Sequence, residues 1–433
     1  MTQGSLLNLP RALLSMEECG IDALIATSPV NVGYLSGYFC WLNSLLREYM
    51  VKPGGTGNLP EAYAILTRDG SAALVVNAVF SPDAARLGGV KAYLFGSPGV
   101  DLSESQKPAA GDEPLWAALM ASDKYPSALS ALHAAIRDCG LSGGQIGIEL
   151  DSFPPERAQQ VTDALPQADF KDCTNLLRLV RAVKSPEEIR RLTRAAAISE
   201  AAGLEALDLA RTGASIRELR QHYHTRAAAM GAVFDHFAFS PHGLGISMSA
   251  DFTLNGDDVL YVDFGCKYEE YFSDTGLTLA IAPLSTPLER RYAALQDSLS
   301  AGMREMKPGA KASAIHQAMA DAFASHGFAH CFPHGHGLGL EVRDYPILVP
   351  DAGLTIQDGC VRVPADLVME EGMVNNLEAC VFVPGAGSVH MEKTYLVTAD
   401  SCRPLVPQER RRPFSPRMEE GRRGEMKGMV QGV

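Results

Sequence analysis

Carboxylates that interrupt apolar, strand-like runs are the feature that most constrains how this chain can fold. Asp263 ends the run Val259–Val262, and Glu378 lies inside the largely apolar run Met373–Val381. A buried carboxylate stays ionised only at a high free-energy cost unless a cation or a hydrogen-bond donor compensates its charge. Any fold of this chain must therefore supply such a partner for both side chains.

A second aspartate is expected beside the first. Asp274 follows Asp263 closely in the sequence and comes just before another strand-like segment, Leu277–Ile281. A hairpin over this stretch would bring the two carboxylates side by side on antiparallel strands. Solvated aspartates at strand ends are the alternative, because Asp is common in such positions.

Histidines alternate with glycines at His334–Gly337. Glycine adds no side-chain bulk around His336, so another group can approach the imidazole closely. A mobile glycine loop with incidental histidines is the alternative. Glu392 then precedes the strand-like segment Lys393–Val397.

Four carboxylates and one imidazole together make an oxygen-rich set of candidate metal ligands. They are Asp263, Asp274, His336, Glu378 and Glu392. Two divalent ions about 3.5–4 Å apart can share bridging carboxylates and a bridging hydroxide. The donor set suits manganese, iron, cobalt or zinc, and magnesium less well because of the histidine.

Three segments are expected along the chain. The first 175 residues alternate strand-like and helix-like patterns, which is typical of an α/β domain, assigned to residues 1–180. Ser185–Glu188 is a capping box with proline at the first helical position, so a new domain begins near residue 184 and extends to 405. Its order of strands, helices and strands predicts class α+β. Residues 409–433 are charged and are predicted to be a disordered tail.

Composition excludes several kinds of partner. The formal charge of −13 and the lack of a Lys/Arg stripe before the last 25 residues argue against nucleic-acid binding. Nine cysteines without a CxxC pair argue against a disulfide framework and a zinc finger. No run approaches the ~18 apolar residues of a membrane span, and no signal peptide is recognised. We therefore expect a soluble, cytoplasmic protein without a membrane partner.

The motifs, in this order, resemble the pita-bread metallopeptidase and creatinase superfamily, which includes methionine aminopeptidase, Xaa-Pro aminopeptidase and prolidase. The matching segments are VDFGCKYEEYFSDTG, HGHGLGLEV, GMVNNLEA, HMEKTYLVT, RAVKSPEEIRRLTRAA and NVGYLSGY, spread over roughly residues 10–400. The resemblance implies a C-terminal pita-bread domain of class α+β, preceded by an α/β creatinase-type N-terminal domain. It also implies a homodimer.

The resemblance assigns a role to each candidate ligand. Asp263 would bind one metal ion, Asp274 and Glu392 would bridge two, and His336 and Glu378 would complete the set. Glu378 would also take a proton from a bridging water, since metal-bound water has a pKa near 7. The implied activity is hydrolysis of a C–N bond, amide or peptide, in a small substrate of the Xaa-Pro dipeptidase or aminopeptidase type. The full ligand set makes the metal-free mechanism of creatinase an unsuitable one for this chain.

The sequence departs from the family at two histidines. One should lie near Ile246–Ser249, where no histidine occurs, so His242 is the nearest candidate for a catalytic role. The other is replaced by Arg343. Arginine does not lose its proton near neutral pH, but it can bind a carboxylate through a bidentate fork. Arg343 is therefore expected to bind an acidic group of the substrate, and a salt bridge to Asp344 or Glu341 is the alternative.

Three more residues are candidates for substrate binding: His334, Tyr34 and Trp41. In two-domain relatives the region that contains the two aromatic residues lines the substrate pocket, sometimes across a dimer; core packing is the alternative. The departures keep other functions open. One alternative function is hydrolysis of an amide, lactam or amidine that carries a carboxylate. A second is a metal-dependent lyase in which Arg343 holds the carboxylate of the substrate. The third is a non-catalytic binding protein.

Overall fold

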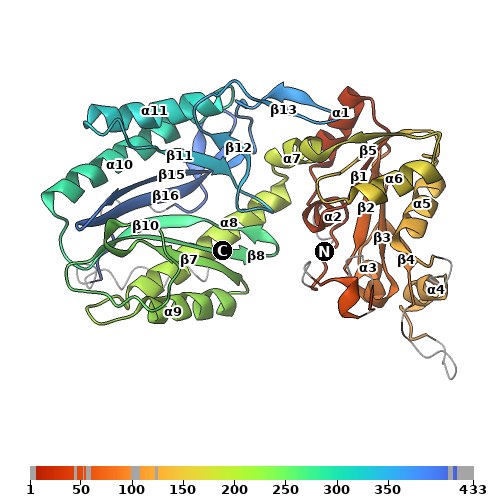
Figure 1. The fold of residues 1–433 in the computed structure, drawn as a ribbon, viewed down its shortest axis with the longest axis horizontal. Coiled ribbons are helices and arrows are strands. Elements are labelled where there is room, and N and C mark those ends of the chain that lie inside the picture. The colour runs from red at the N-terminus through yellow and green to blue at the C-terminus, as the bar shows by residue number, and fades with distance from the viewer. Residues whose placement is uncertain are drawn as a thin grey trace. The chain divides into compact units, whose positions relative to one another are not determined.

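The computed structural model describes residues 6–42, 46–51, 53–54, 60–97, 99, 108–121, 125–407 and 413–416. It divides into two compact units (Figure 1). The first is formed within Met1–Arg181 together with Thr355–Val363, and the second within Ala182–Leu354 together with Pro364–Val433.

The N-terminal unit is built on a six-stranded sheet in the order β4-β3-β2-β1-β5-β6. The strands are β1 (Ala23–Ala26), β2 (Ala62–Thr67), β3 (Ala72–Asn77), β4 (Val90–Phe95), β5 (Gln145–Ile148) and β6 (Asp169–Asp172). The helices are α1 (Leu9–Cys19), α2 (Pro29–Ser36), α3 (Ser81–Ala85), α4 (Glu113–Ala121), α5 (Ala128–Asp138), α6 (Pro155–Ala164) and α7 (Thr174–Ala182), with short 3₁₀ turns at η1 (Glu48–Met50) and η2 (Ala78–Phe80). Parallel and antiparallel neighbours are mixed, since β1 pairs antiparallel with β2 and parallel with β5. The predicted α/β class is confirmed.

One short hairpin lies in a different unit from the one that the sequence suggested. Strands β13 (Thr355–Gln357) and β14 (Arg362–Pro364) were expected within the domain 184–405, but residues 355–363 belong to the N-terminal unit. The carboxylate of Asp358 accepts hydrogen bonds from the backbone N–H groups of Asn175 and Leu176, at 2.7 and 3.0 Å. The first turn of a helix has free N–H groups that need acceptors, and Asp358 supplies one to α7.

The C-terminal unit begins with the helix that the capping box predicts, α8 (Pro186–Leu207). The Ser185 hydroxyl accepts a hydrogen bond from the backbone N–H of Glu188, and the Glu188 carboxylate accepts one from the N–H of Ser185. The remaining helices are α9 (Ile216–Ala229), α10 (Thr286–Glu305) and α11 (Ala312–Ser325), with a 3₁₀ turn at η4 (Pro241–Gly243).

A nine-stranded sheet forms the centre of this unit, with the main path β12-β11-β15-β16-β10-β8-β7 and with β17 and β9 paired to β16 and β8. The strands are β7 (Val233–Phe239), β8 (Val259–Tyr268), β9 (Tyr271–Phe272), β10 (Thr275–Ala280), β11 (His334–Gly337), β12 (Asp344–Leu348), β15 (Val374–Val383), β16 (Gly387–Val397) and β17 (Cys402–Pro404). Helices α8 and α9 pack on β7, β8 and β10, whereas α10 and α11 pack on β15 and β16 (Figure 1). The class is α+β, as predicted.

Alternation along the strands separates an apolar face of the sheet from a polar one. In β16, Val389, Met391 and Tyr395 belong to the core beneath α10 and α11. His390 and Glu392 therefore point to the other face, because successive side chains of a strand point in opposite directions. The helices cover one face, and the polar residues are gathered on the other.

The chain end contributes to this sheet. Phe414 is 2% exposed within the core formed with α8, α9 and β8. Its N–H donates to the carbonyl oxygen of Thr278 at 2.9 Å, and its own carbonyl oxygen accepts from the N–H of Ala280 at 2.8 Å. The prediction of a disordered tail over 409–433 is therefore wrong for residues 413–416, because the apolar ring of Phe414 is buried. The other residues of that segment lie outside the described part of the chain.

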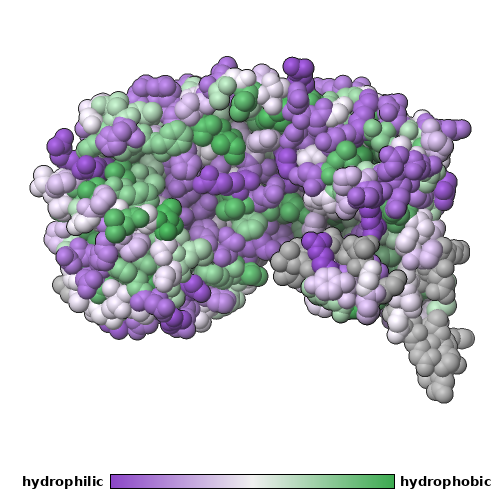
Figure 2. All heavy atoms as spheres, in the orientation of Figure 1, coloured by the Kyte–Doolittle hydropathy of each residue, from purple (hydrophilic) through white to green (hydrophobic). Residues whose placement is uncertain are grey.

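The described helices are too short or too polar for any of them to cross a membrane. In the view of Figure 2, hydrophobic residues at the surface of the C-terminal unit form small areas among hydrophilic ones.

Gly203 of α8 offers a test of how tightly the helix packs on the sheet. A Cβ at this position would overlap the ring of Phe264. We expect Gly203→Ala to lower the free energy of unfolding by about 1–3 kcal/mol, because inserting a methyl group forces the ring or the helix to move. Thermal unfolding checks this, with Gly88→Ala as the control, since a Cβ there meets open space. Equal midpoints for the two variants would contradict the packing.

Candidate metal centre

The five predicted ligands come together on the polar face of the C-terminal sheet. Glu378 of β15 lies opposite Glu392 of β16, and Asp263 of β8 lies opposite Gly276 of β10. Asp274 immediately precedes β10, and its carboxylate Oδ2 lies 3.6 Å from Nε2 of His336. Strand pairing therefore brings residues that are far apart in the sequence into overlapping groups of three that could each hold an ion.

The carboxylates repel one another in a buried setting. Burial raises the pKa of Asp274 to about 7, with further contributions from the charges of Asp263 and Glu378. Burial likewise holds the pKa of Glu392 well above its usual range, and the charge of Asp274 adds to the effect. The cluster thus carries more negative charge than its surroundings stabilise, which is what a divalent cation would offset.

Two of the carboxylates are stabilised in their charged form by histidines. Burial opposes ionisation of Glu378, but the close contact with His334 and the proximity of His390 outweigh it and lower its pKa below the usual range. Burial also opposes ionisation of Asp263, and its hydrogen bond with His236 outweighs it and lowers its pKa. The imidazoles of nearby histidines thus compensate part of the negative charge of Glu378 and Asp263.

Several buried donor atoms in the cluster lack a hydrogen bond within the described residues. They are Nε2 of His336, Nε2 of His390 and Oε2 of Glu392. Buried polar atoms are almost always hydrogen-bonded, so an exception requires an explanation, and a bound ion is one. These are the atom types that bind manganese, iron, cobalt or zinc. The residues present therefore fit a metal centre.

His336 is held in the form that a metal ligand requires. Its Nδ1 lies 3.0 Å from the carbonyl oxygen of Gly337, and since a carbonyl can only accept, Nδ1 carries the hydrogen. Burial lowers the pKa of His336 to about 4, so the ring is neutral near pH 7. The lone pair is then on Nε2, which faces Asp274.

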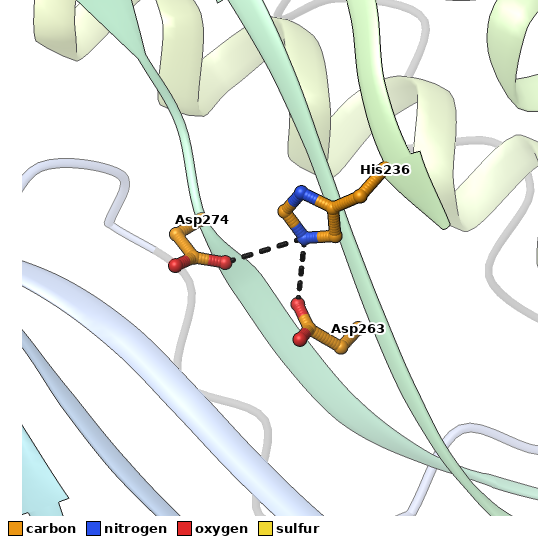
Figure 3. Close-up of side chains that lie close together, drawn as sticks. All are labelled: His236, Asp263 and Asp274. Atoms are coloured by element: carbon orange, nitrogen blue, oxygen red, sulfur yellow. Dashed lines mark hydrogen bonds and ion pairs between the residues drawn. The ribbon is translucent and has the colours of Figure 1, made fainter. Parts of the chain in front are cut away.

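His236 lies beside the two aspartates, and the sequence did not single it out. Its Nε2 is 3.0 Å from Oδ1 of Asp263 and 3.4 Å from Oδ1 of Asp274 (Figure 3). Burial disfavours protonation of its ring, but hydrogen bonds with Asp235, Asp263 and Asp274 outweigh it and raise its pKa to about 12. Without a metal ion, a protonated His236 thus partly neutralises the carboxylates.

The structure places His242, the candidate that the sequence offered for a catalytic role, away from the two aspartates. Its side chain is about half exposed, and its ring lies against Phe252, with centroids 5.4 Å apart. Strand β7 runs antiparallel to β8, so the side chain that reaches Asp263 comes from further back in the sequence. His236 is paired with Gly265, two residues after Asp263 and on the same face of β8.

His390 was also missed, although the sequence carried a signal for it. It is two residues before Glu392 on the same strand, and a period of two places both side chains on one face. Its buried ring stacks on Tyr261, with centroids 3.9 Å apart and planes 15° apart. Its Nε2 lies 3.5 Å from Oε2 of Glu392 and 3.7 Å from Oε1 of Glu378.

Arg343 and His334 meet at Glu378. Nε2 of His334 is 2.9 Å from Oε2 of Glu378, and Nη2 of Arg343 is 3.5 Å from the same oxygen. The side chain of Arg343 is 56% exposed, so its guanidinium remains accessible to a ligand. Asp344, one of the alternative partners, lies 3.7 Å from Nζ of the buried Lys184.

The two aromatic candidates belong to the N-terminal unit. Tyr34 is 1% exposed, and its hydroxyl oxygen accepts a hydrogen bond from the N–H of Asn8, which favours the core-packing alternative over its predicted role in substrate binding. Trp41 is 73% exposed and its ring meets the edge of Phe80. A substrate-binding role for Trp41 stays a prediction.

Comparison with known proteins agrees with this architecture. The Xaa-Pro dipeptidase of Lactobacillus helveticus is 28% identical over 266 residues, covering 58% of this chain and 68% of that protein. The Xaa-Pro dipeptidase of Pyrococcus horikoshii is 26% identical over 276 residues, covering 61% and 74%. The structure of a Xaa-Pro dipeptidase from Bacillus anthracis superimposes with a TM-score of 0.70 at 19% identity, covering 93% of this chain and 97% of that one.

Two family profiles cover most of the chain. "Creatinase/Prolidase N-terminal domain" matches residues 9–183, and "Metallopeptidase family M24" matches residues 190–399. Members of the second family generally bind a pair of metal ions, and the clustered carboxylates and histidines of this chain are candidates to hold them. The chain therefore belongs to metallopeptidase family M24, with a creatinase/prolidase N-terminal domain, and is a metallohydrolase.

Proposed function

We propose that the protein is a Xaa-Pro dipeptidase or aminopeptidase that uses two divalent ions, of manganese, iron, cobalt or zinc. The observation that carries the proposal is the convergence of the five ligand residues, with the unbonded atoms His336 Nε2 and Glu392 Oε2, on the polar face of the sheet. The names of the relatives from Lactobacillus helveticus and Pyrococcus horikoshii support the substrate class. We further propose a cytoplasmic homodimer, as the family resemblance suggests.

Each residue around the centre has a proposed role in hydrolysis. Asp263, Asp274, His336, Glu378 and Glu392 would hold the ions. When bound, the ions polarise the scissile carbonyl and make water more acidic. Glu378 takes a proton from the attacking water and passes it to the departing amine, since it is the ligand whose carboxylate also contacts groups at the accessible side of the centre. His334, 2.9 Å away, orients that carboxylate.

Arg343 provides the contact for the substrate's own charge. A Xaa-Pro dipeptide has one free α-carboxylate close to the scissile bond, and the exposed guanidinium lies next to Glu378. Arginine can bind such a carboxylate with two parallel hydrogen bonds. Arg343 therefore selects substrates with a carboxylate near the bond that is cut.

The same contact favours a second candidate function. Arg343 and Glu378 together suit any small amide, lactam or amidine that carries a carboxylate, and they also suit a lyase in which Glu378 removes a proton next to a bound carboxylate. Product analysis separates these functions. Hydrolysis adds water across a C–N bond, whereas elimination releases an unsaturated product.

Glu378→Gln tests the catalytic assignment. We expect kcat on Xaa-Pro dipeptides to fall by about 10²–10⁴-fold, because glutamine cannot accept the proton. Steady-state kinetics at saturating metal would measure this, together with the metal content of the variant. Glu371→Gln, which changes an exposed glutamate, is the control. Full activity of Glu378→Gln would refute the assignment.

Arg343→Gln tests the substrate contact. For a dipeptide with a free C-terminus, kcat/KM should fall about tenfold or more, since a charge-assisted hydrogen bond contributes about 1.5–3 kcal/mol. For the same dipeptide with an amidated C-terminus, wild type and variant should differ little. Arg304→Gln, at an exposed position of α10, is the control. A loss of equal size on both substrates would show that Arg343 does not bind the carboxylate.

Glu392→Gln separates metal binding from folding. Glutamine keeps an acceptor for the Asn376 side-chain amide but removes a buried charge. We expect the metal-free variant to unfold at a temperature no lower than that of the metal-free wild type, because an uncompensated buried charge is destabilising. The rise in melting temperature on adding Mn²⁺ or Zn²⁺ should be smaller than in wild type, with fewer ions bound per chain. A wild-type metal content in this variant would contradict a ligand role for Glu392.

A further inference from the structure

We propose that His236 and His390 are metal ligands in addition to the five residues above, so that three imidazoles rather than one bind the pair of ions. We infer from this that the centre prefers zinc, cobalt or iron(II) to manganese. The inference rests on the proposed two-metal function and concerns the ligand set of that same site.

The geometry at His236 is that of a metal-binding histidine with an oriented ring. Nδ1 lies 2.7 Å from a carboxylate oxygen of Asp235, which accepts its hydrogen. A carboxylate that holds the far nitrogen of an imidazole is the usual support for a histidine ligand, because it fixes the ring and increases the basicity of the other nitrogen. That other nitrogen, Nε2, faces Asp263 and Asp274 (Figure 3).

The ring of His390 is oriented in the same way by a different acceptor. Nδ1 lies 3.2 Å from the carbonyl oxygen of Val262, which can only accept, so Nδ1 carries the hydrogen and Nε2 has the lone pair. The side chain is fully buried, and Nε2 has no hydrogen-bond partner among the described residues. Its nearest charged neighbours are Glu378 and Glu392. A buried, unbonded nitrogen directed at two carboxylates is well placed to bind a cation that they share.

The chain leaves space for both rings. A Cβ on Gly265 would overlap the ring of His236, and a Cβ on Gly276 would overlap the ring of His390. Neither glycine has a positive φ, so the close approach of the imidazole, rather than the backbone conformation, is what excludes a side chain. Both histidines thus occupy positions that the neighbouring strands accommodate specifically.

The separations between donor atoms match those of atoms that share an ion. Two atoms bound at about 2.1 Å lie about 3.0 Å apart on adjacent corners of an octahedron and about 3.4 Å apart in a tetrahedron. Nε2 of His236 lies 3.0 and 3.4 Å from its two aspartate oxygens. For His390 the separations are 3.5 and 3.7 Å, close to the tetrahedral value.

Imidazole nitrogen changes which metal ions the centre favours. Carboxylate and water oxygens suit manganese and magnesium, whereas imidazole suits zinc, iron and other borderline ions. Two more imidazole nitrogens in the ligand set raise the affinity of the centre for metal ions, and the gain grows from manganese through iron and cobalt to zinc. With only His336, this preference would be weaker.

X-ray absorption of the zinc-loaded, full-length protein tests the proposal, because imidazole rings give a distinct scattering signature. We expect three imidazoles for each pair of ions in wild type. His236→Gln and His390→Gln should each lose one and should weaken Zn²⁺ binding, measured by calorimetry, by about tenfold or more, with a smaller effect on Mn²⁺. His222→Gln, on the surface of α9, is the matched control and should leave both quantities unchanged.

Gly276→Ala provides a second variant that keeps the imidazole but displaces it. It should reproduce the loss seen with His390→Gln. One imidazole per ion pair in wild type, or Zn²⁺ affinity unchanged in both histidine variants, would overturn the proposal, and the wild-type spectrum decides even if a variant does not fold. Three imidazoles without cleavage of any Xaa-Pro peptide would uphold this ligand set and reject the proposed peptidase activity. Cleavage with a single imidazole would do the reverse.

Discussion

Four carboxylates that repel one another lie on one face of the C-terminal sheet, and the fold of this unit has to compensate their charge. Asp263, Asp274, Glu378 and Glu392 come from strands or strand ends that neighbour one another, so the pairing that builds the sheet also concentrates negative charge. The core beneath the helices favours this arrangement, while the charges oppose it. Neighbouring histidines relieve part of that conflict, and divalent ions of the kind that M24 metallopeptidases generally bind would relieve more of it and supply hydrolytic chemistry.

The histidines around the cluster distinguish this chain from a simple carboxylate cage. His334 contacts Glu378, His336 faces Asp274, and His236 lies against both aspartates. Neutral imidazole is a ligand, whereas protonated imidazole is a counter-ion, so one ring can compensate carboxylate charge with or without a metal. The imidazoles beside these carboxylates are therefore suited to compensate their charge in either state.

Much of the fold could be predicted from the sequence, and so could five of the residues that the structure gathers as candidate metal ligands. Buried strands with a single embedded carboxylate are rare enough that Asp263 and Glu378 were identifiable directly. His236 could not be found in this way, because its approach depends on the register between β7 and β8, which includes an irregularity between Phe234 and His236. The hairpin at Asp358 was placed in the other unit, since a capping contact between distant segments leaves no local pattern.

Phe414 pairs with a strand that is synthesised more than 130 residues earlier, which bears on when the site can form. Its backbone pairs with Thr278 and Ala280 of β10, the strand that follows Asp274. The five candidate ligands that the sequence predicted are spread from residue 263 to residue 392, so almost every contact in the centre is non-local. During synthesis, carboxylates made early must wait for partners made much later, and long-range strand pairing of this kind is intrinsically slow. The candidate metal centre is thus complete only after the chain through Glu392 has been synthesised and its strands have paired.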